Sequence, residues 1–419
     1  MSLSKIREYS LHWLCATFML PIAVSNIGLI VFVLSSILLI ITKKRIGKEQ
    51  NITALLSTIL ISSIFLLYIA YLPFQDKIDV SILQDKLMIL ILPILLCLTH
   101  ISKNTFIQLI KTFVISNALL SLILIGKNIF HFINTSELLL FHDFTSLYQI
   151  HAVYVSYILF IGIMFCIYFL SIGESFLKFK NPYIFIILLI LIFLITLFLC
   201  ASKNVIITCF LIGLIYFLYS SSLGLKTSFT IISFIILGAS VGTISSPKLK
   251  NRLAEVTSLS GIEFIQSDSV LTNIEMRKIN GTSLRLLLIK FGINIIKEND
   301  ALLLGVSPYE SKEHLTIQYK KRGMEDWFGG YEFHNQYLTY LVEFGLLGLF
   351  IYLGAIISLG FNFIKQHNYL ALAILMGFVL FQFSETILIR YKGQMLFLFF
   401  SFLFLNIFNF ERESSNNRN

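Results

Sequence analysis

The chain has 419 residues, of which 57% are apolar and 13% are charged, and its mean hydropathy is +0.84. Soluble proteins carry about 25% charged residues, so this composition excludes an ordinary soluble protein and predicts an all-α polytopic membrane protein. The net charge of +9 does not indicate a nucleic-acid partner, because much of the excess lies in short basic clusters beside apolar runs. The positive-inside rule explains such clusters. The five cysteines have no metal-ligand spacing, so neither a zinc site nor a disulfide framework is expected.

The apolar runs predict about 12 membrane crossings, since a helix needs about 20 apolar residues to span a bilayer. The stretch 9–42 is broken by Pro21 and Gly28 and is interpreted as a tight hairpin of two helices. Both termini are then cytoplasmic, as are basic residues such as Lys103 and Lys365. The other crossings are expected near 51–71, 81–98, 104–125, 149–170, 183–200, 203–221, 229–245, 337–361, 369–387 and 394–410.

These crossings divide the chain into four parts. Residues 1–245 carry the first nine helices, 246–333 form one large hydrophilic loop on the outer side, 334–410 carry the last three helices, and 411–419 form a cytoplasmic tail. The charge of the loop does not place it, because loops longer than about 60 residues escape the positive-inside rule. The loop is the one long polar stretch of the sequence, so outer-face chemistry is sought there first.

Lys203 lies in a short polar break between two apolar runs, at the outer side of the bundle. A lysine costs roughly 2.5 to 3.5 kcal/mol at the bilayer centre by insertion scales, and less at the edge. Lys203 is therefore either a snorkelling boundary lysine or a functional cation, and the residues alone leave both interpretations open.

Within the loop, an amphipathic helix is predicted from Thr282 to Lys297, with Thr282 or Ser283 as its cap. Such a helix lies on the membrane surface or packs against the bundle, which holds Arg285 near the bilayer boundary. Spacing alone favours a snorkelling cation there. Its apolar face is formed by Leu284, Leu287, Leu288, Phe291 and Ile295.

Further along the loop, Lys320, Lys321 and Arg322 form a basic cluster. A solvated charge run is the default interpretation, and binding of a phosphorylated acceptor is the alternative. In the last outer turn, Glu385 and Arg390 are expected to form a structural ion pair.

His334 lies at the end of the loop, in the polar segment 331–338 that runs directly into an apolar helix. The partial positive charge of a helix N-terminus favours neutral imidazole there. An isolated histidine at such a place is more often structural than catalytic, so the sequence context alone does not assign it a role.

Three groups of residues, in this order and spacing, resemble the O-antigen ligase and polymerase superfamily. The resemblance covers about 185–400 in sequence pattern and the whole chain in topology. Its most specific part is the last group. The groups are Ser202-Lys203 at a helix start, Leu284-Arg285-Leu286 leading to Leu304-Gly305-Val306-Ser307-Pro308, and His334-Asn335-Gln336-Tyr337-Leu338 followed by Glu343-Phe344-Gly345-Leu346-Leu347-Gly348.

The resemblance implies a GT-C-like glycosyltransferase in the bacterial inner membrane, with no metal or other cofactor and a periplasmic active site. The implied donor is a glycan on undecaprenyl diphosphate, and in the ligase branch the acceptor is a sugar of the lipid A core. His334 is then the implied general base, and Arg285 and Lys203 are the implied diphosphate ligands. Family members usually carry arginine at the position of Lys203. Supporting roles are expected for Asn335, Tyr337, Glu343 and Arg390.

Ligase and polymerase share the donor, and the single large outer loop and the chain length favour the ligase. Transfer of the glycan from the same donor to a protein is a further alternative. A transporter or flippase is the alternative from another class, but such proteins commonly show internal repeats, and none is evident in this sequence.

Overall fold

The computed structural model describes residues 2–43, 52–74, 80–99, 101–172, 182–220, 263–266 and 268–407. Every regular element in these ranges is a helix, and eight of the helices are long and apolar enough to cross a membrane. The all-α polytopic class is therefore confirmed. The predicted crossing at 229–245 and the tail 411–419 lie outside the described residues, so the count of 12 stays a prediction.

The N-terminal stretch folds as the predicted hairpin. Helices α1 (Leu3–Thr17) and α2 (Ile22–Lys43) pack on each other on either side of Pro21. The Trp13 indole donates to the Val24 carbonyl at 2.9 Å, and the Ser25 hydroxyl donates to the Thr17 carbonyl at 2.9 Å. These bonds tie α1 and α2 together across the break.

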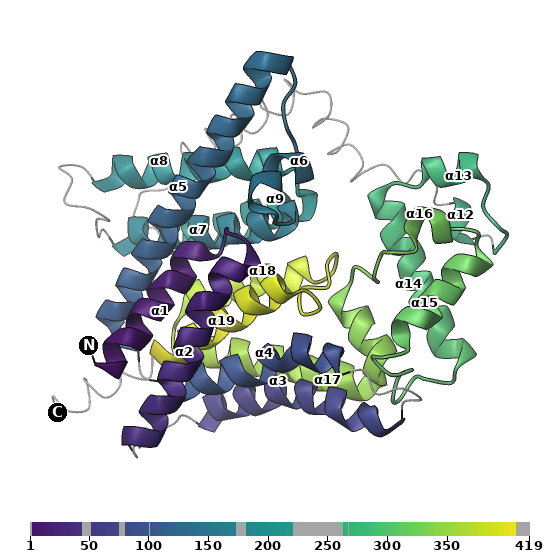
Figure 1. The fold of residues 1–419 in the computed structure, drawn as a ribbon, viewed down its shortest axis with the longest axis horizontal. Coiled ribbons are helices and arrows are strands. Elements are labelled where there is room, and N and C mark those ends of the chain that lie inside the picture. Colours follow the sequence, from purple (N-terminus) through teal and green to yellow (C-terminus); the bar gives the residue numbers. More distant parts are fainter. Residues whose placement is uncertain are drawn as a thin grey trace.

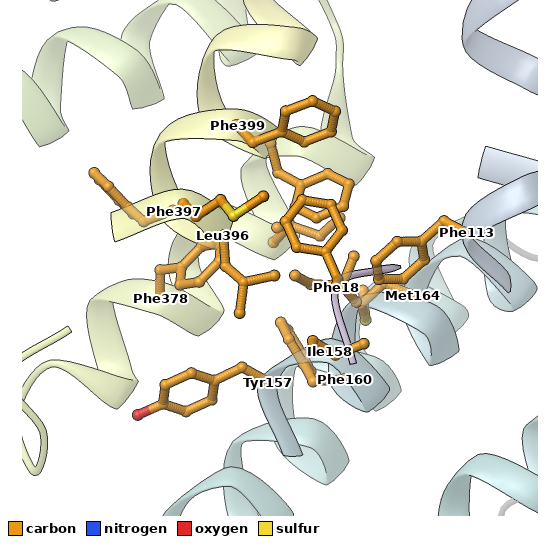
Figure 2. Close-up of a cluster of buried hydrophobic side chains, with 14 of the residues drawn as sticks. Phe18, Phe113, Tyr157, Ile158, Phe160, Met164, Phe378, Leu396, Phe397 and Phe399 are labelled. Atoms are coloured by element: carbon orange, nitrogen blue, oxygen red, sulfur yellow. The ribbon is translucent and has the colours of Figure 1, made fainter. Parts of the chain in front are cut away.

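Helix α7 (Ala152–Ile172) is the centre of the bundle, with 83% of its span buried inside the protein. Around it, rings such as Phe18, Phe113 and Phe400 meet edge to face or tilted, which is a favourable geometry for aromatic pairs (Figure 2). The surrounding helices are α3 (Ile52–Tyr71), α4 (Ser81–Leu98), α5 (Lys103–Thr135), α8 (Pro182–Cys200), α9 (Lys203–Ser220), α17 (Gln336–Lys365), α18 (Tyr369–Phe381) and α19 (Tyr391–Ile407), with the short η1 (Leu72–Phe74), α6 (His142–Thr145) and η2 (Ser146–Tyr148) at helix ends.

The described part of the large loop forms a small helical unit at one end of the bundle, drawn in green in Figure 1. Its centre is α14 (Gly281–Glu298), whose buried face is the predicted apolar one. The predicted cap was wrong: Asn280 caps α14, and its side-chain oxygen accepts from the backbone N–H groups of Thr282 and Ser283, each at 2.9 Å. The other helices of this unit are α12 (Glu263–Gln266), α13 (Asn273–Lys278), α15 (Ser311–Lys321) and α16 (Glu325–Phe328).

Helix α17 is interrupted by Gly345, whose backbone has φ 65° and ψ −159°. The interruption frees the Val342 and Glu343 carbonyls, which accept from the N–H groups of Val306 at 2.8 Å and Ser307 at 3.2 Å. A break inside an apolar helix is tolerated where other groups satisfy the freed backbone, and a segment of the loop supplies them here.

The opposite side of the same break is satisfied in the same way. The freed N–H groups of Leu346 and Leu347 donate to the carbonyls of Leu302 at 2.9 Å and Leu303 at 3.3 Å. The loop segment 302–307 and the break at Gly345 therefore exchange four backbone hydrogen bonds.

Candidate active site

A shared carboxylate forms the centre of the site. Glu385, in the turn between α18 and α19, accepts from the Arg285 guanidinium at 3.1 Å through one oxygen. Its other oxygen lies 3.4 Å from Nδ1 of His334. The three side chains come from the loop helix α14, from the start of α17 and from the last turn, so the fold brings together residues that are far apart in sequence.

The environment of Glu385 favours its charged form. Burial alone would raise the pKa of this carboxyl group, but the hydrogen bond and charge of His334 and the charge of Arg285 outweigh burial and hold the pKa below its ordinary value. Glu385 is thus a carboxylate at neutral pH and can only accept hydrogen bonds. A carboxylate that only accepts can orient the His334 ring through a proton on Nδ1, with Nε2 turned away from it.

Arg285 is held on three sides by the protein. In addition to Glu385, its Nε donates to the Ser384 carbonyl at 3.0 Å and one terminal nitrogen donates to the Gly281 carbonyl at 3.1 Å. A guanidinium has five N–H donors, so two remain for an anionic ligand. The interpretation of Arg285 as a mere snorkelling cation was wrong, since it forms an ion pair with a carboxylate of the bundle.

His334 has a backbone φ of 50°, in the left-handed region that a non-glycine residue seldom adopts. The following residue, Asn335, caps α17: its side-chain oxygen accepts from the Leu338 N–H at 2.9 Å, and its amide nitrogen donates to the Phe383 carbonyl at 3.2 Å. The predicted position of His334 just before a helix start is confirmed. Asn335 ties that start to the turn that carries Glu385.

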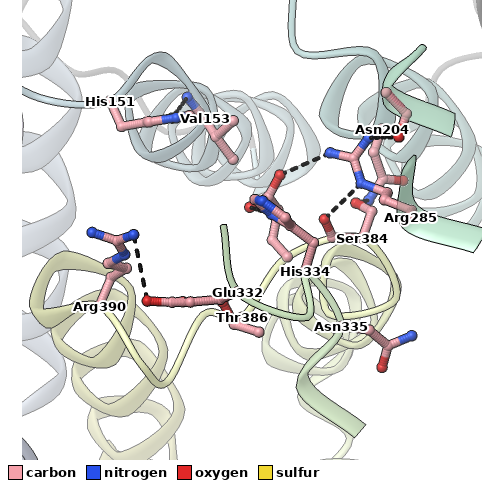
Figure 3. Close-up of polar contacts among 12 residues, drawn as sticks. His151, Val153, Asn204, Arg285, Glu332, His334, Asn335, Ser384, Thr386 and Arg390 are labelled. Atoms are coloured by element: carbon pink, nitrogen blue, oxygen red, sulfur yellow. Dashed lines mark hydrogen bonds and ion pairs between the residues drawn. The ribbon is translucent and has the colours of Figure 1, made fainter. Parts of the chain in front are cut away.

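Arg390 belongs to a second ion pair beside the first one. It lies 3.4 Å from Glu332, which also accepts from the Thr386 hydroxyl at 3.0 Å (Figure 3). The predicted pairing of Arg390 with Glu385 was therefore wrong: Glu385 pairs with Arg285 and His334 instead. Two ion pairs now flank one turn, with Arg390 the more exposed of the two arginines.

Helix α9 reaches the same turn through Asn204, which the sequence reasoning missed. Its amide donates to the Ser384 hydroxyl at 2.5 Å and to the Leu380 carbonyl at 3.3 Å. Lys203 is the preceding residue and the first of α9. The contacts with the turn thus come from Asn204, and Lys203 stands beside them.

His151 is a second histidine that the sequence reasoning missed. It directly precedes α7, and its Nδ1 accepts from the Val153 N–H at 3.3 Å (Figure 3). Burial, together with the charges of His142, Arg390 and His334, lowers the pKa of His151 to about 4 against the opposing charge of Glu385, so its ring is neutral near pH 7. The signal that could have found it is the one that marked His334, a histidine at the outer start of an apolar helix.

The other predicted supporting residues make structural contacts away from the cluster. The Tyr337 hydroxyl donates to the Val379 carbonyl at 2.9 Å, which ties α17 to α18. Glu343 is buried in α17 and accepts from the Tyr68 hydroxyl at 3.1 Å. Glu343 thereby joins α17 to α3.

Two buried lysines hold the turn between α18 and α19 in place. Lys86 of α4 donates to the carbonyls of Leu388 at 2.9 Å and Ile389 at 3.2 Å. Lys392 donates to the Phe18 carbonyl at 3.1 Å and to the Ser25 hydroxyl at 2.7 Å. The ammonium groups hold the turn that presents Glu385 and Arg390 against α4 and the N-terminal hairpin.

The three members of the basic cluster each have an acidic neighbour. Lys320 lies 3.4 Å from Glu325, and Lys321 lies 2.8 Å from Glu298. Arg322 is buried rather than solvated, and it donates to the Phe264 carbonyl at 2.6 Å. Arg322 therefore holds the loop together, while the two lysines remain at the surface.

In the part of the chain that the structure describes, no group of three or more His, Cys, Asp and Glu side chains is arranged to hold a metal ion. No curated protein matches the chain. Residues 187–353 match a family model described as O-antigen ligase, and this segment includes Lys203, Arg285 and His334. The chain is therefore a multi-pass membrane protein in which residues 187–353 are similar to the O-antigen ligase family, whose members are glycosyltransferase-like enzymes acting on polysaccharides.

Proposed function

We propose that the chain is an O-antigen ligase, which transfers a glycan from undecaprenyl diphosphate to a sugar of the lipid A core on the periplasmic face of the bacterial inner membrane. The observation that carries the proposal is the carboxylate of Glu385, which touches both Arg285 and His334. Because Glu385 holds both side chains, His334 can act as a base on the attacking hydroxyl while Arg285 binds the leaving diphosphate in the same displacement.

His334 is the general base in this proposal. Its Nε2 removes the proton from the acceptor hydroxyl while the hydroxyl oxygen forms a bond to the anomeric carbon of the donor. Histidine is the side chain that most often serves as a general base in enzymes. Glu385 orients the ring through Nδ1 and stabilises the imidazolium that forms. Attack from one face while the diphosphate leaves from the other inverts the anomeric centre.

Arg285 holds the leaving group. As the bond from the anomeric carbon to the diphosphate oxygen breaks, the electron pair goes to that oxygen, and fixed cations stabilise the developing charge. The two unused N–H groups of Arg285 suit a phosphate oxygen pair, whereas Lys203 supplies a point charge. Arg390 lies on the same turn as Glu385 and adds a third cation for the diphosphate.

In this proposal the loop unit binds the acceptor. Lys320 and Lys321 are exposed enough to exchange their acidic partners for phosphates of a core oligosaccharide. Neutralising both, with Arg322 kept for folding, is expected to raise the acceptor concentration needed for half-maximal transfer and to leave the donor requirement unchanged.

A polymerase, or an enzyme that transfers the glycan to a protein, uses the same donor and the same cluster. These candidates differ in the acceptor, for which the cluster offers no discrimination. A polysaccharide transporter or flippase needs no base, so the His334 and Glu385 contact argues against it.

The test is lipopolysaccharide profiling of a deletion strain complemented with the wild-type chain or with His334→Ala. We expect His334→Ala to leave a bare core and to accumulate long carrier-linked glycan. Single repeat units would identify a polymerase instead, and an unchanged profile would exclude His334 as the base and favour another acceptor or a transporter.

His367 provides a matched control. It also has a left-handed backbone, with φ 55°, and it lies just after α17, at the opposite end from His334. His367→Ala makes the same change of side chain in a similar backbone conformation and is expected to transfer normally. Both variants must be present in the membrane at the wild-type level.

A further inference from the structure

The loop turn Leu302–Leu304 presents three consecutive leucines to the outside of the protein. Their exposed fractions are 51%, 68% and 60%. A run of exposed leucines in a polar loop is unusual, since contiguous apolar patches on a protein surface mark a binding surface. This turn is separate from the cluster around Glu385 in its contacts.

The position of the turn along the bundle is fixed by backbone hydrogen bonds. Leu302 and Leu303 accept from the N–H groups of Leu346 and Leu347, directly after the break in α17. The part of α17 after the break, 346–365, is about 20 residues long, which is the length that crosses the hydrocarbon core of a bilayer. The leucine turn therefore lies level with the outer boundary of the membrane.

Close packing at two glycines keeps the turn at this depth. A Cβ atom on Gly345 would lie 2.3 Å from the Leu303 carbonyl carbon, and one on Gly305 would lie 2.5 Å from the Glu343 carbonyl carbon. The Tyr71 hydroxyl at the end of α3 also donates to the Leu304 carbonyl. The turn is therefore held against the bundle by both α17 and α3.

The surface around the turn is apolar on the membrane helices as well. Phe350, one helical turn beyond the break in α17, is 64% exposed, and Phe74, after α3, is 81% exposed. The leucine turn continues the lipid-facing surface of these two helices. This continuity selects lipid, rather than a second protein, as the occupant.

We infer that Leu302–Leu304 inserts into the outer leaflet of the bilayer and anchors the loop unit, which also carries Arg285, to the membrane. The removal of apolar surface from water is favourable in proportion to its area, so three exposed leucines make a substantial anchor. The inference goes beyond the proposed reaction and does not depend on it.

The test is the depth of a spin label in lipid nanodiscs. Leu303→Cys is labelled with a nitroxide, and its collisions with oxygen, which dissolves in lipid, are compared with its collisions with a water-soluble nickel chelate. We expect oxygen to dominate at this position. The unsubstituted chain, labelled in parallel, gives the background from Cys97, the one native cysteine that is not fully buried.

Ile274→Cys on α13 is the matched control. Ile274 is an equally exposed apolar residue of the same loop unit, at 72%, but it lies outside the turn that bonds α17. The nickel chelate is expected to dominate there. Dominance of the chelate at residue 303 would overturn the inference, and so would shielding from both reagents, because protein would then cover the turn.

Discussion

Two of the places at which the loop unit is held to the bundle are built in opposite ways. At the cluster of Arg285, His334 and Glu385, side chains make the contacts and each can be removed singly. At the break in α17, backbone groups make all four hydrogen bonds and glycines allow the approach. The cluster has side-chain atoms that can take part in a reaction. The break in α17 has none, and it fixes the position of the loop unit on the bundle. Substitutions should therefore separate activity from folding.

The largest effect is expected for Gly345→Ala. The backbone of Gly345, at φ 65° and ψ −159°, lies in a region that is essentially reserved for glycine, and the added Cβ would meet the Leu303 backbone at 2.3 Å. The strain alone costs about 1 to 3 kcal/mol. We expect loss of folded protein, measured as monodisperse yield in detergent and as melting temperature.

Gly126→Ala tests the same change where nothing is close. Gly126 lies in α5, and a Cβ added to it would meet no atom within 4 Å. Alanine is favoured over glycine inside a helix by roughly 0.5 to 1 kcal/mol. An equal loss of yield in both variants would show that the yield of folded protein does not depend on the break in α17.

The next largest effect is expected for Glu385→Gln, which keeps the size of the side chain and removes its charge. Because His334 then loses the group that orients its proton, we expect transfer to fall by about 10²-fold or more, the range of general acid and base catalysis. The melting temperature should change far less than in Gly345→Ala. A proportional loss of both would mean that Glu385 serves folding alone.

A smaller effect is expected for Arg285→Lys. Lysine keeps the charge but loses the planar fork, so it cannot bond Ser384, Gly281 and Glu385 together. We expect roughly a tenfold loss of transfer at saturating acceptor. Lys203→Arg is the companion variant, and it should retain transfer or improve it. A gain in Arg285→Lys would contradict the assignment of a bidentate anion site.

The smallest effect is expected at mildly acidic pH. The pKa of His151 is lowered to about 4 from its ordinary value near 6.5, so the unfolded chain binds a proton that the folded chain excludes. Stability should fall as pH drops from about 6.5 towards 4. The melting temperature of His151→Gln, compared at pH 7 and pH 5, should drop less than that of the wild type. An identical drop would exclude this histidine as the cause.

Much of the fold was predicted from the sequence, because the length and spacing of apolar runs indicate the length of a helix and its buried face. The hairpin around Pro21, the amphipathic face of α14 and the helix start after His334 were all predicted correctly. The break at Gly345 was not predicted, since it depends on the loop segment 302–307 that satisfies it. Periodicity describes a helix alone and contains no information about a distant partner.

The site was predicted in part for a similar reason. His334 and Arg285 were singled out, but their shared partner Glu385 was assigned to Arg390, its neighbour in sequence. The actual partners lie 100 and 51 residues away. Proximity along the chain favoured the wrong pair, and only the packing of the last turn on α14 and α17 determines the right one. His151 and Asn204 were missed because each stands singly in its segment.

The exchange of hydrogen bonds at Gly345 bears on the biogenesis of the protein. Residues 302–307 leave the ribosome before Gly345 does, so the loop segment that satisfies the break is already made when α17 is synthesised. Without that segment, the break would leave four backbone groups of α17 without the partners that they have in the folded protein. The two parts of α17 can therefore take their final arrangement only after residues 302–307 have docked on the break.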